Sequence, residues 1–301
     1  MRQAARLLPA AGAHGGDGAR VAAALGLDPS SVLDLSASLN PAAPDPAAVV
    51  GRHLDQLGRY PDPTPAAGAL ADAIGAPPGS VLLTNGGAEA IALVAAVLGG
   101  RVEEPEFSLH PRGQGPLWRS DPHNPTGLLA AADERAGVRD EAFYPLATGR
   151  WTRGDPGTVV VGSLTKLFAC PGLRLGYVLA DPGLVAELKA RQPAWSVNAL
   201  AAGALPDLLA SADLARWAAE IAALRRDLTD LLARHGLDPA PSDANFVLCR
   251  NATGLRERLA PHAVVVRDCA SFGLPGQARI AVPPADGLAR LAAALELALD
   301  R

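Results

Sequence analysis

The stretch Ser163-Leu164-Thr165-Lys166, followed by Pro171-Gly172-Leu173-Arg174-Leu175-Gly176-Tyr177, decides how this sequence is interpreted. The apolar run Thr158–Val161 just before it predicts a buried strand, so Ser163 and Lys166 are expected at the carboxyl end of that strand, where ligands bind in open α/β sheets. Ser163 and Arg174 can offer a hydroxyl and a bidentate guanidinium to a phosphate group. Lys166 adds an amine that becomes nucleophilic when it is buried or close to other cations.

Lysine is rare in this sequence. Only Lys166 and Lys189 occur, while arginine is plentiful and supplies most of the positive surface charge. A primary amine can form an imine with an aldehyde, which a guanidinium that never deprotonates cannot do. We therefore predict that Lys166 is kept for its chemistry and that Lys189 is a surface residue on a helix.

Composition limits the kinds of protein that this chain can be. Its 301 residues are 49% hydrophobic, enough for one large core or two unequal ones. The formal net charge of −4 gives no domain-wide basic surface for nucleic acid. The three cysteines are far apart and lack metal-ligand spacing, so we expect no metal site, no disulfide framework and a cytoplasmic location.

The hydrophobic residues do not suggest a membrane protein. No apolar run is long enough to span a bilayer, so no membrane partner is expected. Residues Arg2–Ala13 faintly resemble a signal peptide, because two arginines precede a short apolar run. Since that run contains Pro9, we favour an ordinary N-terminal arm.

Strands and helices are expected to alternate up to about residue 205. Such alternation favours an α/β layer around a mainly parallel sheet. Hydrophobic periodicity and turn residues predict strands at Ser80–Thr84, Thr158–Val161 and Leu175–Leu179, and helices at Ala88–Leu98 and Leu184–Arg191.

The later part of the chain follows a different pattern, which predicts a smaller α+β domain. A long amphipathic helix is expected at Ala212–His235, followed by three strands and a last helix: Asn245–Cys249, Ala263–Arg267, Arg279–Val282 and Asp286–Leu299. We expect an N-terminal arm at residues 1–40 that contributes to this small domain, a large domain at 41–206 and the small domain at 207–301, with the boundary near Pro206.

A glycine motif, Thr84-Asn85-Gly86-Gly87-Ala88-Glu89, joins a predicted strand to a predicted helix. Glycines at such a junction let backbone N–H groups approach an anion at the helix N-terminus. The motif therefore predicts a phosphate cradle, although most glycines at such junctions only make turns.

Two polar motifs follow the glycine motif along the chain. Asn124, in His123-Asn124-Pro125-Thr126-Gly127, precedes a proline and is expected to present its amide to a cleft. Asp140, in Asp140-Glu141-Ala142-Phe143, can pair with a protonated ring nitrogen. Taken singly, a simple Asn-Pro turn and a helix-capping acid are the commoner explanations.

The joint order of these motifs resembles the fold-type I aminotransferase superfamily, whose cofactor is pyridoxal 5′-phosphate (PLP). Within it, the chain is similar to the threonine-phosphate decarboxylase and histidinol-phosphate aminotransferase group. The resemblance implies a three-layer, PLP-transferase-like large domain. It covers most of the chain and includes further segments at His14–Gly16, Asp34–Pro41, Arg59–Pro63, Trp195–Leu200, Ala244–Phe246 and Val266–Cys269.

The resemblance implies roles for the motif residues in holding PLP. Lys166 would bind the cofactor as a Schiff base, and Asp140 would pair with the pyridine nitrogen and make the ring an electron sink. Asn124 would donate a hydrogen bond to the phenolic oxygen. The cofactor phosphate would be held by Gly87, Ala88, Ser163 and Arg174.

The resemblance also implies substrate and partner contacts. Arg279 would bind the α-carboxylate of a small amino acid or phosphorylated amino compound, with Asn40 and His14 also at the substrate. Tyr60 would reach the cofactor phosphate of a neighbouring subunit, since such enzymes are usually homodimers that share two sites.

Several positions depart from the pattern of the superfamily. His110 takes the place of a tyrosine in Pro105-Glu106-Phe107-Ser108-Leu109-His110 and would stack on the cofactor ring. Phe143 replaces a tyrosine near the phenolic oxygen. The intervals from Phe107 to Asn124 and from Gly127 to Asp140 are short, so we expect a trimmed large-domain sheet. Arg139 stands where a buried apolar strand residue is expected.

The sequence leaves the reaction open. His14-Gly15-Gly16, Trp195-Ser196-Val197-Asn198 and Arg267-Asp268-Cys269 favour a threonine-phosphate decarboxylase-like enzyme, a branch associated with cobalamin biosynthesis. A histidinol-phosphate-type aminotransferase is the first alternative. A degenerate PLP-fold protein with little turnover is the second, suggested by the shortened large domain.

Overall fold

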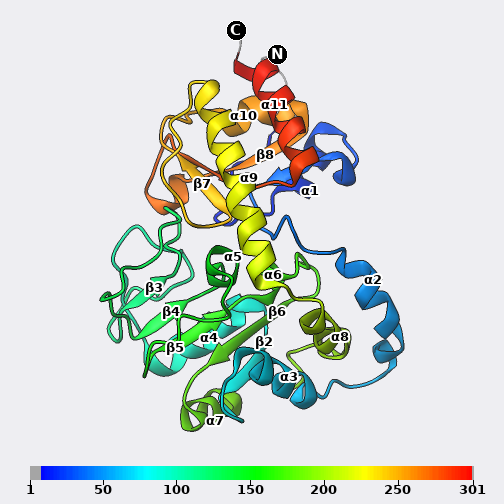
Figure 1. Ribbon diagram of the computed structural model, residues 1–301, viewed down its shortest axis with the longest axis vertical. Helices are drawn as coiled ribbons and strands as arrows, with labels where there is room; N and C mark the ends of the chain where they lie inside the picture. Colours follow the sequence, from blue (N-terminus) through cyan, green and yellow to red (C-terminus); the bar gives the residue numbers. More distant parts are fainter. Residues whose placement is uncertain (1–7, 300–301) are drawn as a thin grey trace.

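The protein, described here for residues 8–299 by a computed structural model, is built around two sheets (Figure 1). The larger sheet has five strands in the order β2-β6-β5-β4-β3. Four of them run in one direction and β6 runs the other way, so the predicted mainly parallel sheet is confirmed. The strands are β2 (Val81–Asn85), β3 (Trp118–Ser120), β4 (Val138–Asp140), β5 (Val159–Gly162) and β6 (Leu175–Leu179).

Helices cover both faces of this sheet and give the predicted three layers. Alternate residues of one strand point to opposite faces, so Leu82 packs with α4 (Gly86–Leu98) and α7 (Pro182–Arg191), while Leu83 packs in the core on the other face. That second core is formed with α3 (Thr64–Ile74), α5 (Tyr144–Thr148), α6 (Leu164–Leu167) and α8 (Ala199–Ala210). Helix α2 (Pro46–Val50) and the 3-10 helix η3 (Gly51–Gly58) lie against α8.

The smaller sheet has the strand order β1-β8-β9-β7. Strand β1 (Leu33–Leu35) comes from the N-terminal arm and pairs in parallel with β8 (Val264–Asp268), so the arm is part of this domain. The first seven residues of the predicted arm lie outside the described residues. The other elements are α1 (Gly18–Leu25), β7 (Phe246–Cys249), α10 (Leu255–Leu259), β9 (Ala278–Ala281), α11 (Ala285–Leu299) and the 3-10 helices η2 (Pro29–Ser31), η4 (Ala260–His262) and η5 (Ala270–Phe272).

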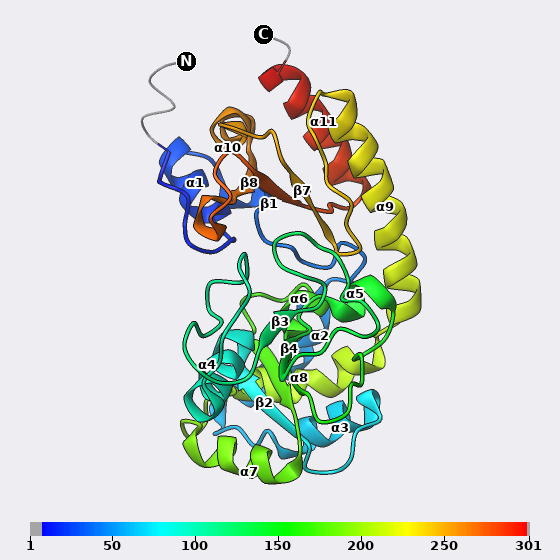
Figure 2. The ribbon, with the colours of Figure 1, turned by 90° about the vertical axis from the view of Figure 1, so that its left-hand side faces the viewer.

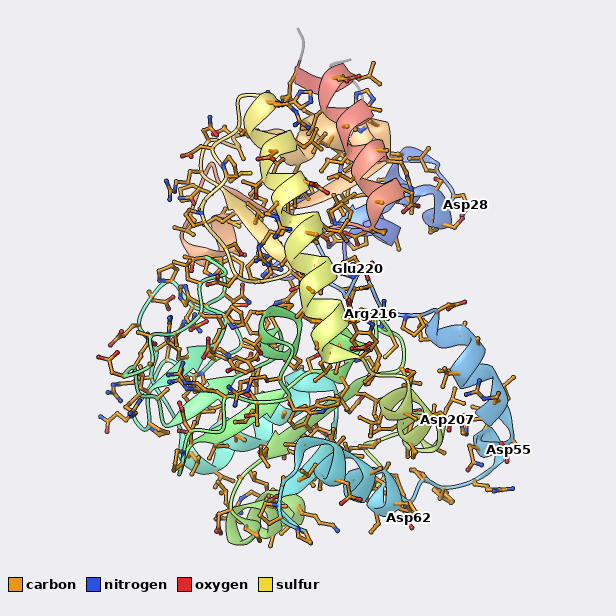
Figure 3. All side chains as sticks on the ribbon, in the orientation of Figure 1. Asp28, Asp55, Asp62, Asp207, Arg216 and Glu220 are labelled. Atoms are coloured by element: carbon orange, nitrogen blue, oxygen red, sulfur yellow. The ribbon has the colours of Figure 1, made fainter. Side chains whose placement is uncertain are left out.

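Helix α9 (Leu214–Arg234) runs along both domains (Figure 2). It begins at Asp213, whose carboxylate accepts a hydrogen bond from the Arg216 N–H. It packs against α5 of the large domain and against β7 and α11 of the small one. Its outer face carries the exposed ion pair between Arg216 and Glu220 (Figure 3).

We propose that the boundary between the domains lies later than the predicted Pro206. That proline is inside α8, and α8 packs against α2, α3 and η3. The first half of α9 still packs into the large-domain core through Leu214, Trp217 and Ile221, and its second half packs into the small-domain core, so we propose that the boundary lies within α9. No helix within residues 8–299 has the length and the apolar character that a membrane crossing requires.

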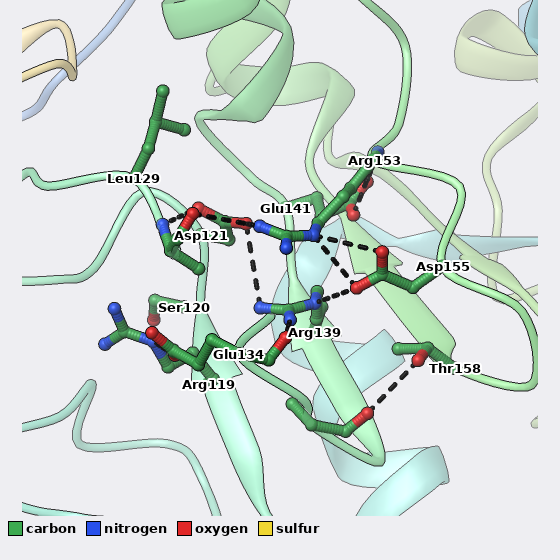
Figure 4. Close-up of polar contacts among 12 residues, drawn as sticks. Arg119, Ser120, Asp121, Leu129, Glu134, Arg139, Glu141, Arg153, Asp155 and Thr158 are labelled. Atoms are coloured by element: carbon green, nitrogen blue, oxygen red, sulfur yellow. Dashed lines mark hydrogen bonds and ion pairs between the residues drawn. The ribbon is translucent and has the colours of Figure 1, made fainter. Parts of the chain in front are cut away.

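The large sheet ends abruptly at β3. Outside β3, the described residues add only an isolated bridge between Arg101 and Leu117. Beside this edge, Arg139 of β4 is fully buried, and its guanidinium pairs with Asp155 at 2.9 Å and lies 3.6 Å from Asp121 (Figure 4). Arg153 pairs with the same two carboxylates. These ion pairs explain how a charged residue occupies an expected apolar strand position.

Candidate active site

A cavity lies where the two domains meet, at the carboxyl ends of β4 and β5 and beside the first turn of α4. The structure brings nine of the twelve predicted site residues into its wall: His14, Gly87, Ala88, Asn124, Asp140, Ser163, Lys166, Arg174 and Arg279. They come from separate segments, so the cavity exists only in the folded chain.

Lys166 lies in the short helix α6, directly after β5. Burial, together with the charges of Arg279 and Arg174, lowers the pKa of its amine from the ordinary 10.5 to about 8, and the charges of Asp140 and Asp34 oppose this shift. A large fraction of the amine is therefore neutral near pH 8. Neutral amine is the form that adds to an aldehyde.

The first turn of α4 and Arg174 form one corner of the cavity. Gly86 has φ +76°, and a Cβ at this position would lie 2.3 Å from Nη2 of Arg174. Only glycine therefore allows the guanidinium to lie over the turn. Arg174 itself has φ +58°, a strained conformation for a residue with a side chain. The Ser163 hydroxyl lies in the same wall, so the corner offers a cation, a hydroxyl and a helix N-terminus to an anion.

Asp140 and Asn124 present a carboxylate and an amide to the cavity. Oδ1 of Asp140 accepts the N–H of Ala142 at 3.0 Å, and Oδ2 lies 3.0 Å from Nε2 of His110. Oδ1 of Asn124 accepts a hydrogen bond from Nη1 of Arg279 at 2.6 Å. The amide nitrogen of Asn124 is therefore the group left for a ligand.

Two buried arginines from the small domain complete the cavity. Arg279 is stacked over Phe246, with its guanidinium carbon 4.6 Å from the ring centroid, and its Nε has no hydrogen-bond partner among the described residues. Burial lowers the pKa of Arg279 to about 10. Arg267 donates to Ser271 and to the carbonyls of Gly12 and Ala13, and its Nε is likewise without a partner.

His14 lies in the same wall as the two arginines. Burial lowers the pKa of its imidazole, and the nearby charges of Arg267 and Lys166 lower it further. This side of the cavity therefore accumulates positive charge that no carboxylate in it balances, which favours an anionic ligand.

His110 is not in the cavity wall. Its side chain is fully buried behind Asp140, with ring centroids 5.6 Å from Phe107 and 5.3 Å from Trp118. In this position His110 cannot stack on a ring in the cavity, so the structure does not agree with the predicted stacking role. Phe107, three residues earlier, lines the cavity instead, and the sequence motif that contains it gave no sign of which aromatic ring would face inward.

Asn40 and Tyr60 also lie away from the cavity. Asn40 is buried and holds the backbone of α6, because its N–H donates to the Lys166 carbonyl and its Nδ2 donates to the Leu167 carbonyl. Asn40 therefore positions the backbone of Lys166 and does not line the cavity. Tyr60 is 80% exposed and stacks on Trp195 with 4.8 Å between ring centroids.

The comparisons with known proteins agree with this geometry. The model of the family described as aminotransferase class I and II matches residues 116–295, which include Lys166, Asp140 and Asn124. The chain belongs to this family. Its members are PLP-dependent enzymes, so the predicted family and the predicted cofactor are confirmed.

Two kinds of curated relatives match this class I and II aminotransferase chain. Histidinol-phosphate aminotransferase 2 of Ralstonia nicotianae is 35% identical over 209 residues, which cover 61% of this chain but only 56% of the relative. The threonine-phosphate decarboxylase of Salmonella typhimurium is 32% identical over 350 aligned positions, which cover 94% of this chain and 95% of the relative. That alignment is longer than the chain, so the relative has segments that this chain lacks.

Solved structures support the same fold. The histidinol-phosphate aminotransferase of Sinorhizobium meliloti, in complex with pyridoxal-5′-phosphate, matches with a TM-score of 0.81 and 19% identity over 94% of each chain. The L-threonine-O-3-phosphate decarboxylase of Porphyromonas gingivalis matches with a TM-score of 0.75 and 21% identity over 90% of this chain and 100% of that one. Identities this low show the fold alone.

The side chains around the cavity fit PLP. The cofactor needs an amine for its aldehyde, a carboxylate for its ring nitrogen, a donor for its phenolic oxygen and a cationic cradle for its phosphate. Lys166, Asp140 and Asn124 would supply the first three, and the α4 turn with Arg174 would supply the last. The described part of the chain has no cluster of three or more metal-ligating side chains.

Proposed function

We propose that this chain is a PLP-dependent decarboxylase of the threonine-phosphate type, acting on an amino acid that carries a phosphate and belonging to cobalamin biosynthesis. The observation that carries the proposal is the pair of buried arginines, Arg267 and Arg279, in one wall of the cavity. Within residues 8–299 both guanidinium groups have only neutral hydrogen-bond partners and no carboxylate in an ion pair, so the wall can bind two anionic groups of one substrate, a carboxylate and a phosphate.

The extent of the sequence match supports this choice. The chain covers 95% of the threonine-phosphate decarboxylase, but only 56% and 64% of the first two histidinol-phosphate aminotransferases. Phe143 supports it as well, since it lies in the cavity wall where a tyrosine donor would favour the aminotransferase pattern.

Each cavity residue would have a separate role in the reaction. When bound, PLP withdraws electrons from the bond broken at the substrate α-carbon. Asp140 would hold a proton on the ring nitrogen, and Phe107 is the aromatic side chain available to cover the ring. Arg279 would bind the carboxylate and orient it, which decides whether that group or the α-proton is lost. Lys166, with a pKa of about 8, can hold or return the proton at its Nζ.

We also propose a homodimer. Tyr60 does not reach the cavity of its own chain, and it lies exposed with Trp195, Leu54 and Leu57. An exposed set of large apolar side chains favours contact with another protein. In a second copy, Tyr60 would complete the phosphate site of its neighbour.

A histidinol-phosphate-type aminotransferase is the second candidate, favoured by the 35% identity to the Ralstonia enzyme. Paired assays on the PLP-loaded protein separate the two. Release of carbon dioxide from phosphothreonine supports the decarboxylase, whereas keto-acid formation from glutamate in the presence of a keto acid or an imidazole phosphate partner that accepts the amino group supports the transaminase. A PLP-loaded protein without either activity would favour the degenerate alternative.

Because Arg279 would bind the carboxylate, Arg267 is the arginine that would bind the substrate phosphate. A variant of Arg267 tests this role within the same assay. Arg267→Gln should raise KM for phosphothreonine about 10-fold or more, since a charge-assisted contact contributes about 1.5–3 kcal/mol. The exposed Arg250, paired with Asp238 on the surface, gives the matched control Arg250→Gln. An equal effect of the two substitutions would contradict a role for Arg267 in substrate binding.

A further inference from the structure

Glu106 is a buried carboxylate that none of the roles above uses. It is 2% exposed. Its Oε2 accepts the Ser120 N–H at 2.9 Å, and its Oε1 accepts the Ser120 hydroxyl at 2.5 Å and the Phe107 N–H at 2.8 Å. Ser120 ends β3, the edge strand of the trimmed sheet, so the Glu106 side chain satisfies an edge N–H that a further strand would otherwise pair.

His110 lies between Glu106 and Asp140. Its Nε2 is 3.0 Å from Oδ2 of Asp140, and its Nδ1 is 3.7 Å from Oε1 of Glu106. The imidazole is closed off from solvent by Phe107 and Trp118. Within the described residues, Nδ1 has no hydrogen-bond partner.

This arrangement constrains the hydrogens on the imidazole. A neutral imidazole has one N–H and one lone pair, so whichever nitrogen lacks hydrogen would direct its lone pair at a carboxylate. With hydrogen on both nitrogens, Nε2 donates to Asp140 at 3.0 Å and the Nδ1 hydrogen faces the Glu106 carboxylate as an ion-pair contact at 3.7 Å. His123 is the other histidine close to Glu106, with Nε2 4.0 Å from Oε2, but its nitrogens already face Pro105 and Thr126 at 2.8 and 2.7 Å.

The orientation of the Asp140 carboxylate depends on this neighbour. The opposite side of Asp140 faces the cavity, where its negative charge acts on Lys166. The imidazole behind Asp140 fixes Oδ2 in one orientation through its 3.0 Å contact with Nε2. A carboxylate in a fixed orientation is what a ring nitrogen in the cavity requires.

We propose that Glu106 is a positioning residue: it keeps hydrogen on both nitrogens of His110, and His110 in turn holds Asp140 toward the cofactor ring. This inference rests on the cofactor role assigned to Asp140 and is independent of which substrate the chain uses. It gives Glu106 two tasks, closing the edge of the sheet and setting the charge behind the cofactor.

Nitrogen-15 NMR of histidine-labelled protein tests the proposal, in the PLP-loaded and PLP-free forms at neutral pH, with His110→Asn used to assign the His110 signals. In the wild type, both His110 nitrogens should show the shift and the one-bond coupling of an N–H. In Glu106→Gln, one of them should lose its hydrogen, and affinity for PLP should fall about fivefold to tenfold as the contact with Asp140 weakens.

Glu103→Gln is the matched control, because Glu103 is an exposed acid three residues earlier. It should leave the His110 signals and the PLP affinity unchanged. A wild-type His110 with one unprotonated nitrogen would overturn the proposal even if Glu106→Gln did not fold, and so would unchanged His110 signals in that variant. Failure of the wild type to bind PLP would instead contradict the cofactor site.

Discussion

Arg279 and Asn124 form a 2.6 Å hydrogen bond that joins the small domain to the large one at the cavity. Arg279 comes from β9, and Asn124 follows β3. The bond fixes the Asn124 amide with its oxygen toward the arginine and its nitrogen toward the ligand. Arg279, which would bind substrate, and Asn124, which would bind cofactor, are therefore joined by a direct hydrogen bond.

Replacing Arg279 with lysine should weaken substrate binding. A lysine keeps the charge but cannot contact a carboxylate and Asn124 with the same planar fork. We expect KM to rise about 10-fold to 100-fold, as for the loss of one charge-assisted hydrogen bond of about 1.5–3 kcal/mol. Arg290→Lys, at an exposed position of α11, should change KM by less than about twofold. Steady-state kinetics with equal KM values for both variants would count against the assignment.

The rate of PLP uptake should follow the ionisation of Lys166. Because the pKa of its amine is lowered to about 8, the charged form predominates below pH 8 and the neutral form above it. The uptake rate of the PLP-free protein should rise about tenfold per pH unit below that value and level off above it. Stopped-flow absorbance measures this rate. A midpoint near 10.5, the ordinary value for lysine, would show that burial does not act on Lys166.

Gly86→Ala should damage the phosphate cradle. A residue with a side chain at φ +76° costs about 1–2 kcal/mol, and its Cβ would displace the Arg174 guanidinium. We expect lower stability and PLP affinity reduced about tenfold by equilibrium titration. Gly68→Ala is the control, because that position in α3 has open space and should gain about 0.5–1 kcal/mol. Equal affinities in the two variants would argue against the cradle.

Glu141 should make stability depend on pH. Burial raises the pKa of its carboxyl from 4.5 to about 7, partly offset by hydrogen bonds from Thr152 and Arg153. Because the folded state binds this proton more tightly, its contribution is complete below pH 4.5 and is lost as pH rises through 7.

Glutamine cannot ionise, so Glu141→Gln removes the loss of stability that deprotonation of Glu141 causes above pH 7. The variant should match the wild type at pH 4.5 and be more stable by up to about 3 kcal/mol at pH 8, measured as urea midpoints with equal slopes. Glu220→Gln, on the exposed face of α9, should show no such pH dependence. A stability difference for Glu141→Gln that is the same at both pH values would contradict the shifted pKa.

Hydrophobic periodicity was sufficient for the elements buried by simple packing. The predicted strand Leu175–Leu179 has the bounds of β6, and the predicted helix at 212–235 corresponds to α9 within two residues. Strand β4 could not be found in this way. It consists of Val138, Arg139 and Asp140, and its central arginine is buried only because Asp121 and Asp155 reach it from distant segments.

The site was predictable where a motif combined a predicted strand end with a distinctive side chain, as for Lys166, and where the order of the motifs resembled the superfamily, as for Asp140. It was not predictable where two candidates stood on one irregular segment. Phe107 and His110 are three residues apart, and only the path of the chain around Pro105 decides that the first faces the cavity and the second lies behind Asp140. Arg267 was noticed within a motif but had no assigned role, because its neighbours Gly12 and Ala13 are far away in sequence.

The central claim is that Lys166 carries PLP, and the two lysines of the chain allow a direct measurement. The PLP-loaded protein is reduced with borohydride, digested and analysed by mass spectrometry, in parallel with Lys166→Arg and Lys189→Arg. We expect the cofactor mass on the peptide that contains Lys166, in the wild type and in Lys189→Arg, and no labelled peptide in Lys166→Arg. Labelling at Lys189, or a colourless wild type that takes up no PLP, would contradict the account.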